Sequence, residues 1–237
     1  METLIKEIEK QIPVSETNMR MLASREVIYA LMAMDKNEKL SKCPLKEIAT
    51  AIINVVKTGL TLNPIMREAY LIPKKGVCKL EPSYMGLSKI LMSDGSVKNF
   101  TAELHWEGDD FTEEKGTSPR IKHIPYYING KAKGKLRGAY SVAVLEGGIV
   151  SHNYMTREEL SVIMGRSEAY KNNAKASTWF TDFGEMCKKT VMKRHWKTLP
   201  KGERAEMAAQ IIDFDNQVNG IDFTKEKEDI VNEIFEK

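Results

Sequence analysis

The sequence predicts an α+β protein with four parts: N-terminal helices, a central twisted antiparallel β-sheet built from hairpins, a long basic helix packed on that sheet, and a short helical, acidic C-terminal tail. Three observations carry this prediction. Apolar residues recur at helical spacing in the N-terminal region, residues 69–155 break into short strand-like pieces separated by turn sequences, and residues 179–191 return to a helical stripe. With 237 residues, 42% of them hydrophobic, the chain can bury a substantial core.

The N-terminal region contains two clear helical patterns. In "SREVIYALMAM" the apolar residues keep helical spacing, and Ser24 is the expected N-cap. In "PLKEIATAIINVVKTGL", Pro44 suits the first helical position and Gly59 suits the left-handed residue that ends a helix. The pattern alone does not say whether these helices complete the core or make another contact.

The middle of the chain reads as β-rich. "EAYLIP" and "GVCKLE" flank a "KKG" turn and predict a hairpin, and a short helix follows that is capped by Ser83 and ends near Asp94. Further strand-like pieces continue to "GIVSHNYM", where Thr156 and Glu159 form a capping box that begins a short helix. Residues 169–178 are polar and predict an exposed loop. A long helix is then expected from about residue 177 to 199, and another at 203–218.

Composition narrows the class of protein. No apolar run is long enough to cross a bilayer, and the N-terminus lacks the apolar segment of a signal peptide. Cys43, Cys78 and Cys187 are odd in number and far apart, and with four scattered histidines they fit neither a zinc spacing nor a disulfide framework. A reducing cytoplasm is the expected location.

The net charge of +3 conceals a strong segregation. Residues 203–237 contain ten acidic and four basic residues, so residues 1–202 carry a charge of +9. Within that basic part, residues 101–114 hold six acids and no Lys or Arg, whereas residues 115–145 hold seven Lys or Arg and no acid. A basic body with an acidic tail suggests a polyanionic partner, although ordinary solvated faces would give the same totals.

The stretch "TWFTDFGEMCKKTVMKRHWKTLP" combines two patterns on one helix. Its apolar residues, from Trp179 to Val191, form a stripe that predicts burial against the sheet. Lys189, Lys193 and Lys197 repeat every four residues, and like charges at this spacing repel one another. A phosphate backbone explains such a row more simply than a solvated face does.

Several motifs together resemble the RecT family of phage single-strand annealing proteins, and more distantly the Redβ recombinases. They are "LNP…YLIP", "YMGL", "GDDF", "IKHIP", "GAYSVAVLEGG", "MTREEL" and "TDFGEMCKKTVMKRHWKTLP", in this order between residues 60 and 200. The resemblance implies ATP-independent binding and annealing of single-stranded DNA in phage homologous recombination, by a ring-shaped or helical homo-oligomer in the bacterial host cytoplasm. It implies no required cofactor, with Mg²⁺ as at most a counter-ion of the DNA. It also implies partners such as a phage exonuclease or a host single-strand binding protein.

The resemblance divides the chain into an N-terminal helical region for oligomer contacts (1–59), a DNA-binding and annealing core (60–200) and a C-terminal helix with an acidic tail (201–237). In the closing helix it places DNA-binding residues at Lys188, Lys189, Lys193, Arg194 and Lys197. The β-rich middle would add Lys74, Lys75, Lys79, Tyr84, Lys89, Lys133, Lys135 and Arg137. The sequence departs from the family pattern at Met85, where a basic residue is usual, and at His195 and Trp196, of which Trp196 is expected to pack rather than stack on a base.

Two other readings remain open. Asp109 and Asp110 could hold Mg²⁺ in a nuclease, but adjacent residues on a strand point to opposite faces, and in a "GDD" turn these carboxylates more simply cap backbone N–H groups. A passive binder that protects single strands without pairing them would have the same composition. No phosphate-binding loop of the "GxxxxGK[ST]" type is present in the sequence.

Overall fold

The computed structural model describes residues 1–211 apart from 75, 94, 204 and 207, and it divides the chain into two compact units. Among the described residues, the first contains 1–93 together with 201–211, and the second contains 95–200. The boundary that the sequence suggested between residues 59 and 60 therefore falls inside the first unit. The predicted acidic tail lies outside the described residues.

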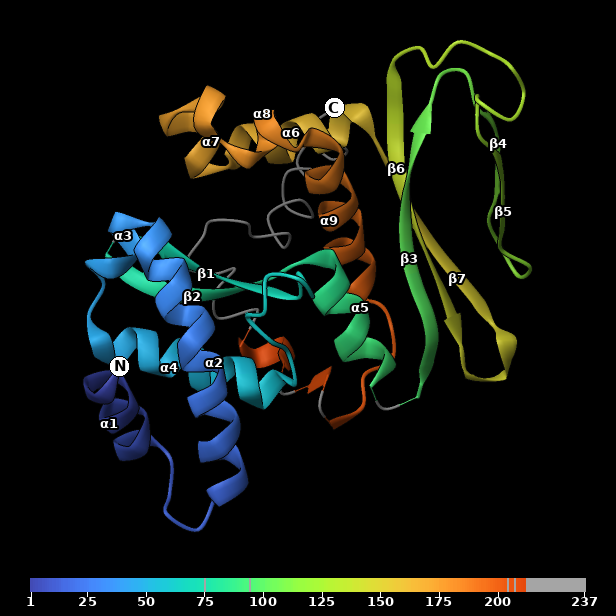
Figure 1. The fold of residues 1–237 in the computed structure, drawn as a ribbon. Helices are drawn as coiled ribbons and strands as arrows, with labels where there is room; N and C mark the ends of the chain where they lie inside the picture. The colour runs from blue at the N-terminus through green and yellow to red at the C-terminus, as the bar shows by residue number, and fades with distance from the viewer. Residues whose placement is uncertain (75, 94, 204, 207, 212–237) are drawn as a thin grey trace, which may run out of the picture. The chain divides into compact units, whose positions relative to one another are not determined.

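The first unit begins with four helices, α1 (Glu2–Gln11), α2 (Thr17–Lys36), α3 (Glu38–Ser41) and α4 (Leu45–Thr58) (Figure 1). The prediction for α4 is confirmed, because its apolar face is buried and Gly59 ends it with φ 71°. The N-cap predicted at Ser24 is wrong. Ser24 lies within α2, where its hydroxyl donates to the Arg20 carbonyl at 2.9 Å, and the helix begins seven residues earlier at Thr17.

A hairpin and a short helix complete this part of the first unit. Strands β1 (Ala69–Lys74) and β2 (Val77–Pro82) pair antiparallel around the predicted turn, and α5 (Tyr84–Met92) follows. Ser83 caps α5 as predicted, accepting from the Gly86 backbone N–H at 3.1 Å. A Cβ at Gly86 would collide with the Glu68 carbonyl, which explains the glycine of the "YMGL" motif by close backbone packing.

The second unit is organised around a three-stranded antiparallel sheet in the order β3-β6-β7. Its strands are β3 (Val97–Trp106), β6 (Leu136–Leu145) and β7 (Val150–Thr156), with a short 3-10 turn, η1 (Glu146–Gly148), between the last two. A separate hairpin of β4 (Asp110–Glu114) and β5 (Arg120–Ile124) lies between β3 and β6 in sequence. The antiparallel sheet and hairpins expected from sequence are thus present, as three small antiparallel sheets.

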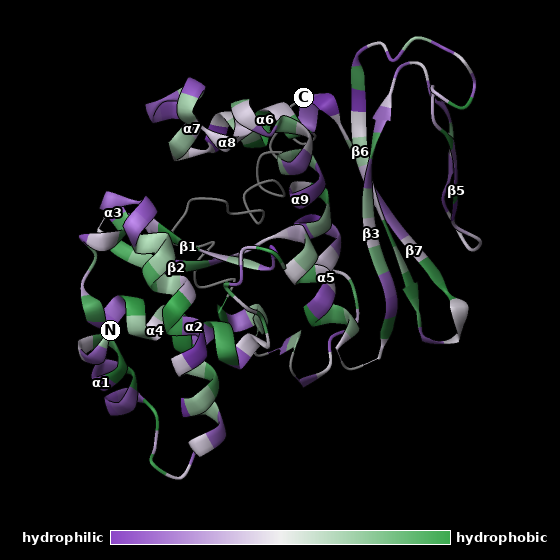
Figure 2. Ribbon diagram, in the orientation of Figure 1, coloured by the Kyte–Doolittle hydropathy of each residue, from purple (hydrophilic) through white to green (hydrophobic). Residues whose placement is uncertain are grey.

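Side-chain alternation gives the β3-β6-β7 sheet two different faces. Along β6, Ala139, Ser141 and Ala143 point to one face, and Tyr140 points to the other. Figure 2 shows hydrophobic and hydrophilic residues mixed along these strands. One face is covered by α9 (Phe183–Trp196) and the other by the β4–β5 hairpin.

Helices α6 (Arg157–Arg166), α7 (Glu168–Asn172), α8 (Thr178–Thr181) and the 3-10 turn η2 (Ala174–Ala176) connect the sheet to α9. The capping box at Thr156 and Glu159 is confirmed. The loop predicted at 169–178 is partly helical, and the single helix predicted from 177 to 199 is divided at Asp182, whose backbone is not helical. Asp is a weak helix former, and Gly184, weaker still, follows two residues later, which favours a break here.

Candidate nucleic-acid interface

Helix α9 presents its apolar side to the sheet, as the stripe predicted. Cys187 and Val191 are fully buried, and a Cβ at Gly184 would press against the Leu104 side chain of β3 at 2.9 Å. Trp179, on the preceding α8, is 4% exposed and lies 6.1 Å from the Phe183 ring. Trp196 is 3% exposed, so the interpretation that it packs is confirmed.

The basic residues of α9 differ in their exposure. Lys189 is half-buried, Lys197 is exposed at the C-cap, and Lys193 between them is only 8% exposed. The sequence predicted a continuous exposed row, and the structure buries its middle member. A lysine stem can lie along apolar surface while its ammonium group reaches outward.

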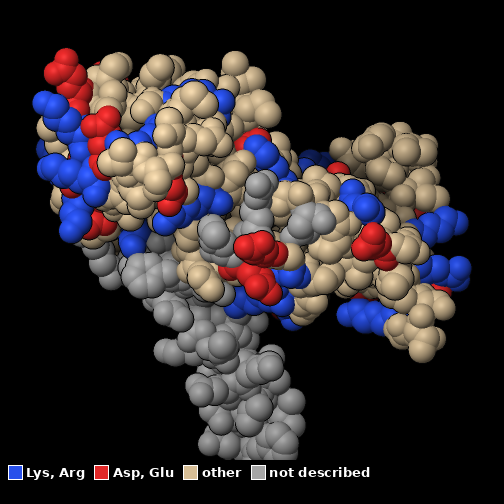
Figure 3. Space-filling view, turned by 90° about the horizontal axis from the view of Figure 1, so that it is seen from below, with Lys and Arg blue, Asp and Glu red and all other residues tan. Residues whose placement is uncertain are grey.

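Two further bases of this region neutralise acids. Lys188 lies 3.4 Å from Glu185 one turn earlier, and Arg194 lies 2.7 Å from Glu159, the residue that closes the capping box of α6. Arg194 therefore ties α9 to α6. Figure 3 shows another face of the molecule, on which Asp and Glu side chains lie next to several of the Lys and Arg side chains.

A second basic segment is the loop that joins β5 to β6, residues 125–135. Lys133 lies over the Trp106 ring, with its Nζ 3.8 Å from the ring centroid, and Lys135 is exposed. Arg137, at the start of β6, pairs with Glu107. The structure therefore brings Lys133, Lys135 and Arg137 together around the turn that follows β3.

These two basic segments belong to opposite faces of one sheet. The imidazole of His195 on α9 makes hydrogen bonds to Ser141 Oγ at 2.8 Å and Ser151 Oγ at 3.0 Å. On the other face, the hairpin residue His123 makes a 2.9 Å hydrogen bond to the Tyr140 hydroxyl. The groove that the resemblance implied, with α9 as one wall and the sheet as the other, would thus have to run around an edge of the sheet.

The hairpin face is a layer of aromatic and titratable side chains. Phe111 stacks on His105 with ring centroids 4.2 Å apart and contacts Tyr154. Burial raises the pKa of Tyr140 and of Tyr154 to about 12, so both hydroxyls stay neutral and hydrogen-bond the imidazoles of His123 and His105. This layer holds the hairpin on the sheet.

Five predicted site residues belong to the first unit. Lys74 pairs with Glu81 at 3.4 Å, and Tyr84 is half-buried in the first turn of α5. Lys79 is half-buried and lines a hollow of about 350 Å³ together with Glu47 and Ile211, whereas Lys75 lies outside the described residues.

Lys89 has a structural partner that sequence reasoning missed. Its ammonium group donates to Glu68 at 2.7 Å and 2.9 Å, and Glu68 is 5% exposed. The second buried acid, Glu26, is 1% exposed and accepts from Thr61 Oγ1 at 2.9 Å and from the Leu62 backbone N–H at 2.7 Å. The sequence did contain a signal for Glu26, because this acid lies on the apolar side of the α2 pattern. A carboxylate at such a position is expected to be buried and to need hydrogen-bond partners.

The two carboxylates considered for a nuclease, Asp109 and Asp110, accept hydrogen bonds from other groups of the protein. Asp109 accepts from the backbone N–H groups of Trp106 at 2.6 Å and Tyr126 at 2.7 Å, so the predicted turn-capping role is confirmed. Burial alone would raise the pKa of Asp109, but these bonds and His123 together lower it. Asp110 pairs with Lys131 and accepts from Asn129. Within the described part of the chain, no group of three or more His, Cys, Asp or Glu residues could hold a metal ion.

Comparison with known proteins shows the family of this chain. Residues 25–230 match the model of the RecT family, and the chain belongs to that family. It is also similar to Protein RecT of Escherichia coli (strain K12), with 28% identity over 189 residues that cover 76% of this chain and 67% of the relative. Family membership implies a protein that binds single-stranded DNA and anneals it in recombination. No helix among the described residues is both long and apolar enough to cross a membrane.

The buried imidazole of His195 predicts a specific pH dependence of stability. Burial, with a smaller contribution from His152, lowers the pKa of His195 from 6.5 to about 4. In the unfolded chain the imidazole of this residue binds a proton at a higher pH than it does in the folded protein. The free energy of unfolding is therefore retained above pH 6.5 and falls as the pH drops from 6.5 to 4. The loss is on the order of 3 kcal/mol. In His195→Gln, whose amide does not titrate, urea unfolding at several pH values should show a smaller loss across this window. An unchanged loss would contradict the assignment.

Proposed function

We propose that this protein anneals complementary single strands of DNA without ATP in homologous recombination, acting as a ring-shaped or helical homo-oligomer. The family match across residues 25–230 carries the proposal. The basic side of α9 supports it, because three cations (Lys188, Lys189 and Lys197) lie on an exposed or half-buried part of a helix that is otherwise fixed to the sheet.

Annealing places particular demands on a binding surface. The surface must neutralise the backbone charge of the strand, and it must leave the base edges free to pair with a complement. Lysine ammonium groups meet the first demand without reading sequence. We further propose Mg²⁺ as at most a counter-ion of the DNA, and an exonuclease or a single-strand binding protein as the protein partner.

The exposed lysines of α9 should determine part of the salt dependence of binding. Replacing Lys189 and Lys197 by Ala removes two phosphate contacts. The slope of log K against log salt for single-stranded DNA should then become shallower by about 1.4. Fluorescence anisotropy at several salt concentrations measures this slope. The control is the double variant Lys6→Ala with Lys10→Ala. Both lysines are exposed on α1, and both precede residues 25–230, which match the family model. Equal slopes in the two double variants would remove α9 from the DNA site.

Annealing itself is tested with two complementary oligonucleotides, one carrying a fluorophore and the other a quencher. The protein should accelerate duplex formation in the absence of ATP, both with and without Mg²⁺. Binding of both strands without acceleration would instead identify a passive single-strand binder. Cleavage that requires Mg²⁺ and is lost in Asp109→Asn would identify a nuclease.

A further inference from the structure

The loop of residues 125–135 displays two large apolar side chains. Tyr127 is 70% exposed and Ile128 is 66% exposed, and they are adjacent. Single exposed apolar residues are common on protein surfaces and need no explanation. Two further properties distinguish this pair: the loop that presents it is firmly anchored, and the same loop carries two lysines, Lys133 and Lys135, that form no ion pair with a carboxylate of the described residues.

The anchoring begins at the turn after β3. Asp109 accepts the Tyr126 N–H, the Gly108 N–H donates to the Lys133 carbonyl at 3.2 Å, and the Glu107 N–H donates to the Lys135 carbonyl at 2.9 Å. The chain passes so close to Gly108 that a Cβ there would collide with the Ala132 carbonyl. Both ends of the loop are therefore held against residues 107–109.

A second set of bonds closes the tip of the loop. The Lys131 N–H donates to the Tyr126 carbonyl at 2.9 Å, and the side chains of Asn129 and Lys131 both bind Asp110. The rings of Tyr126 and Tyr127 pack edge to face with centroids 5.4 Å apart. Because the backbone around Tyr127 is already ordered, a ligand that binds its ring has little conformational entropy left to remove.

Charge indicates what kind of ligand fits. Lys131, Arg137 and Arg120 pair with acids. Over the residues that the structure describes, the ammonium groups of Lys122, Lys133 and Lys135 form no ion pair with a carboxylate, and all three side chains are exposed. A loop that presents both an exposed aromatic ring and lysines without a carboxylate partner in the described part of the chain complements a polyanion that also carries flat apolar groups, which describes single-stranded nucleic acid.

We propose that Tyr127, with Ile128 beside it, contacts an unpaired base of the bound strand, while Lys133 and Lys135 contact the neighbouring phosphates. The inference rests on the proposed function and adds to it a base-contacting residue on the hairpin side of the sheet. Stacking uses the face of a base and leaves its pairing edge free, so this contact is compatible with annealing.

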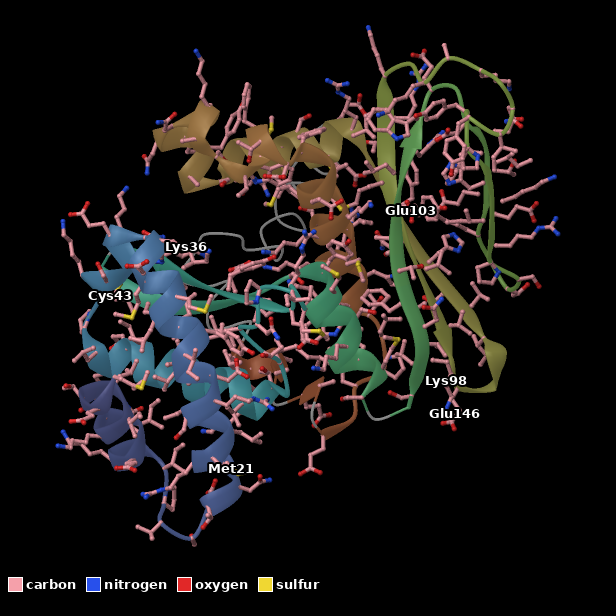
Figure 4. The ribbon with its side chains drawn as sticks, viewed as in Figure 1. Met21, Lys36, Cys43, Lys98, Glu103 and Glu146 are labelled. Carbon is pink, nitrogen blue, oxygen red and sulfur yellow. The ribbon has the colours of Figure 1, made fainter. Side chains whose placement is uncertain are left out.

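The test compares Tyr127→Ala with Ile149→Ala on two ligands. Ile149 is a suitable control because it is also a large exposed apolar residue, with 64% of its surface accessible. It follows η1 at the end of the sheet where Lys98 and Glu146 are labelled in Figure 4, and the 125–135 loop lies at the opposite end. The ligands are oligo(dT) and an abasic strand of equal length. Tyr127→Ala should weaken oligo(dT) binding by about 5- to 140-fold, as expected for one lost stacking contact. It should leave abasic binding and the salt slope unchanged, and Tyr127→Trp should restore binding.

The outcomes separate this inference from the proposed function. If the unaltered protein fails to bind oligo(dT), the proposed function itself fails. If it binds but Tyr127→Ala binds equally well, the base contact is overturned while the function stands. Equal losses of affinity for oligo(dT) and for the abasic strand would also overturn the base contact. So would a loss of self-association of Tyr127→Ala, measured by sedimentation without DNA, because a second copy of the chain would then be the occupant of this surface.

Discussion

Strict alternation of side chains along β6 is the constraint on which the second unit depends. Tyr140 and Ser141 are adjacent in sequence and lie on opposite faces, one bound to the hairpin and the other to α9. A shift of the β6 register by one residue would exchange these partners and place a tyrosine where a serine now meets His195. The ten-residue strands β3 and β6 fix that register along their length, with irregularities only near the two ends of β3.

This sheet separates two groups of cations in the second unit. The first group lies on α9, whose opposite side is fixed by buried apolar residues. The second group lies in the 125–135 loop, which follows a hairpin fixed by hydrogen-bonded aromatic residues. In both groups some bases are neutralised locally, as Arg194 is by Glu159 and Arg137 is by Glu107. The residues that we propose for phosphate contacts are the exposed or half-buried lysines of the two groups, Lys189 and Lys197 on α9 and Lys133 and Lys135 in the loop.

The sequence predicted features that depend on neighbouring residues. The end of α4 at Gly59, the Ser83 cap and the capping box at Thr156 all follow from local backbone demands, and all are present. The apolar stripe of α9 could also be predicted from the sequence, because helical spacing alone determines which residues share a face. Features of this kind need no knowledge of what the segment packs against.

The sequence could not show features that depend on distant residues. The residues next to Lys193 do not reveal that it is buried. Those next to Lys89 do not reveal that it binds Glu68, which precedes it by 21 positions. The assignment of α9 and the hairpin to opposite faces requires the strand pairing, and it depends on contacts such as that between Ser141 and His195. The break at Asp182 was signalled only weakly, by the low helix propensities of Asp and Gly.

The central claim is that single-stranded DNA contacts both groups of cations in the second unit. Chemical acetylation of lysines, measured by mass spectrometry with and without bound oligo(dT), tests it directly. Protection of Lys189 and Lys197 on α9 together with Lys133 and Lys135 in the loop, and no protection of Lys6, is the result predicted. Protection confined to one group, or spread equally to Lys6, would contradict it.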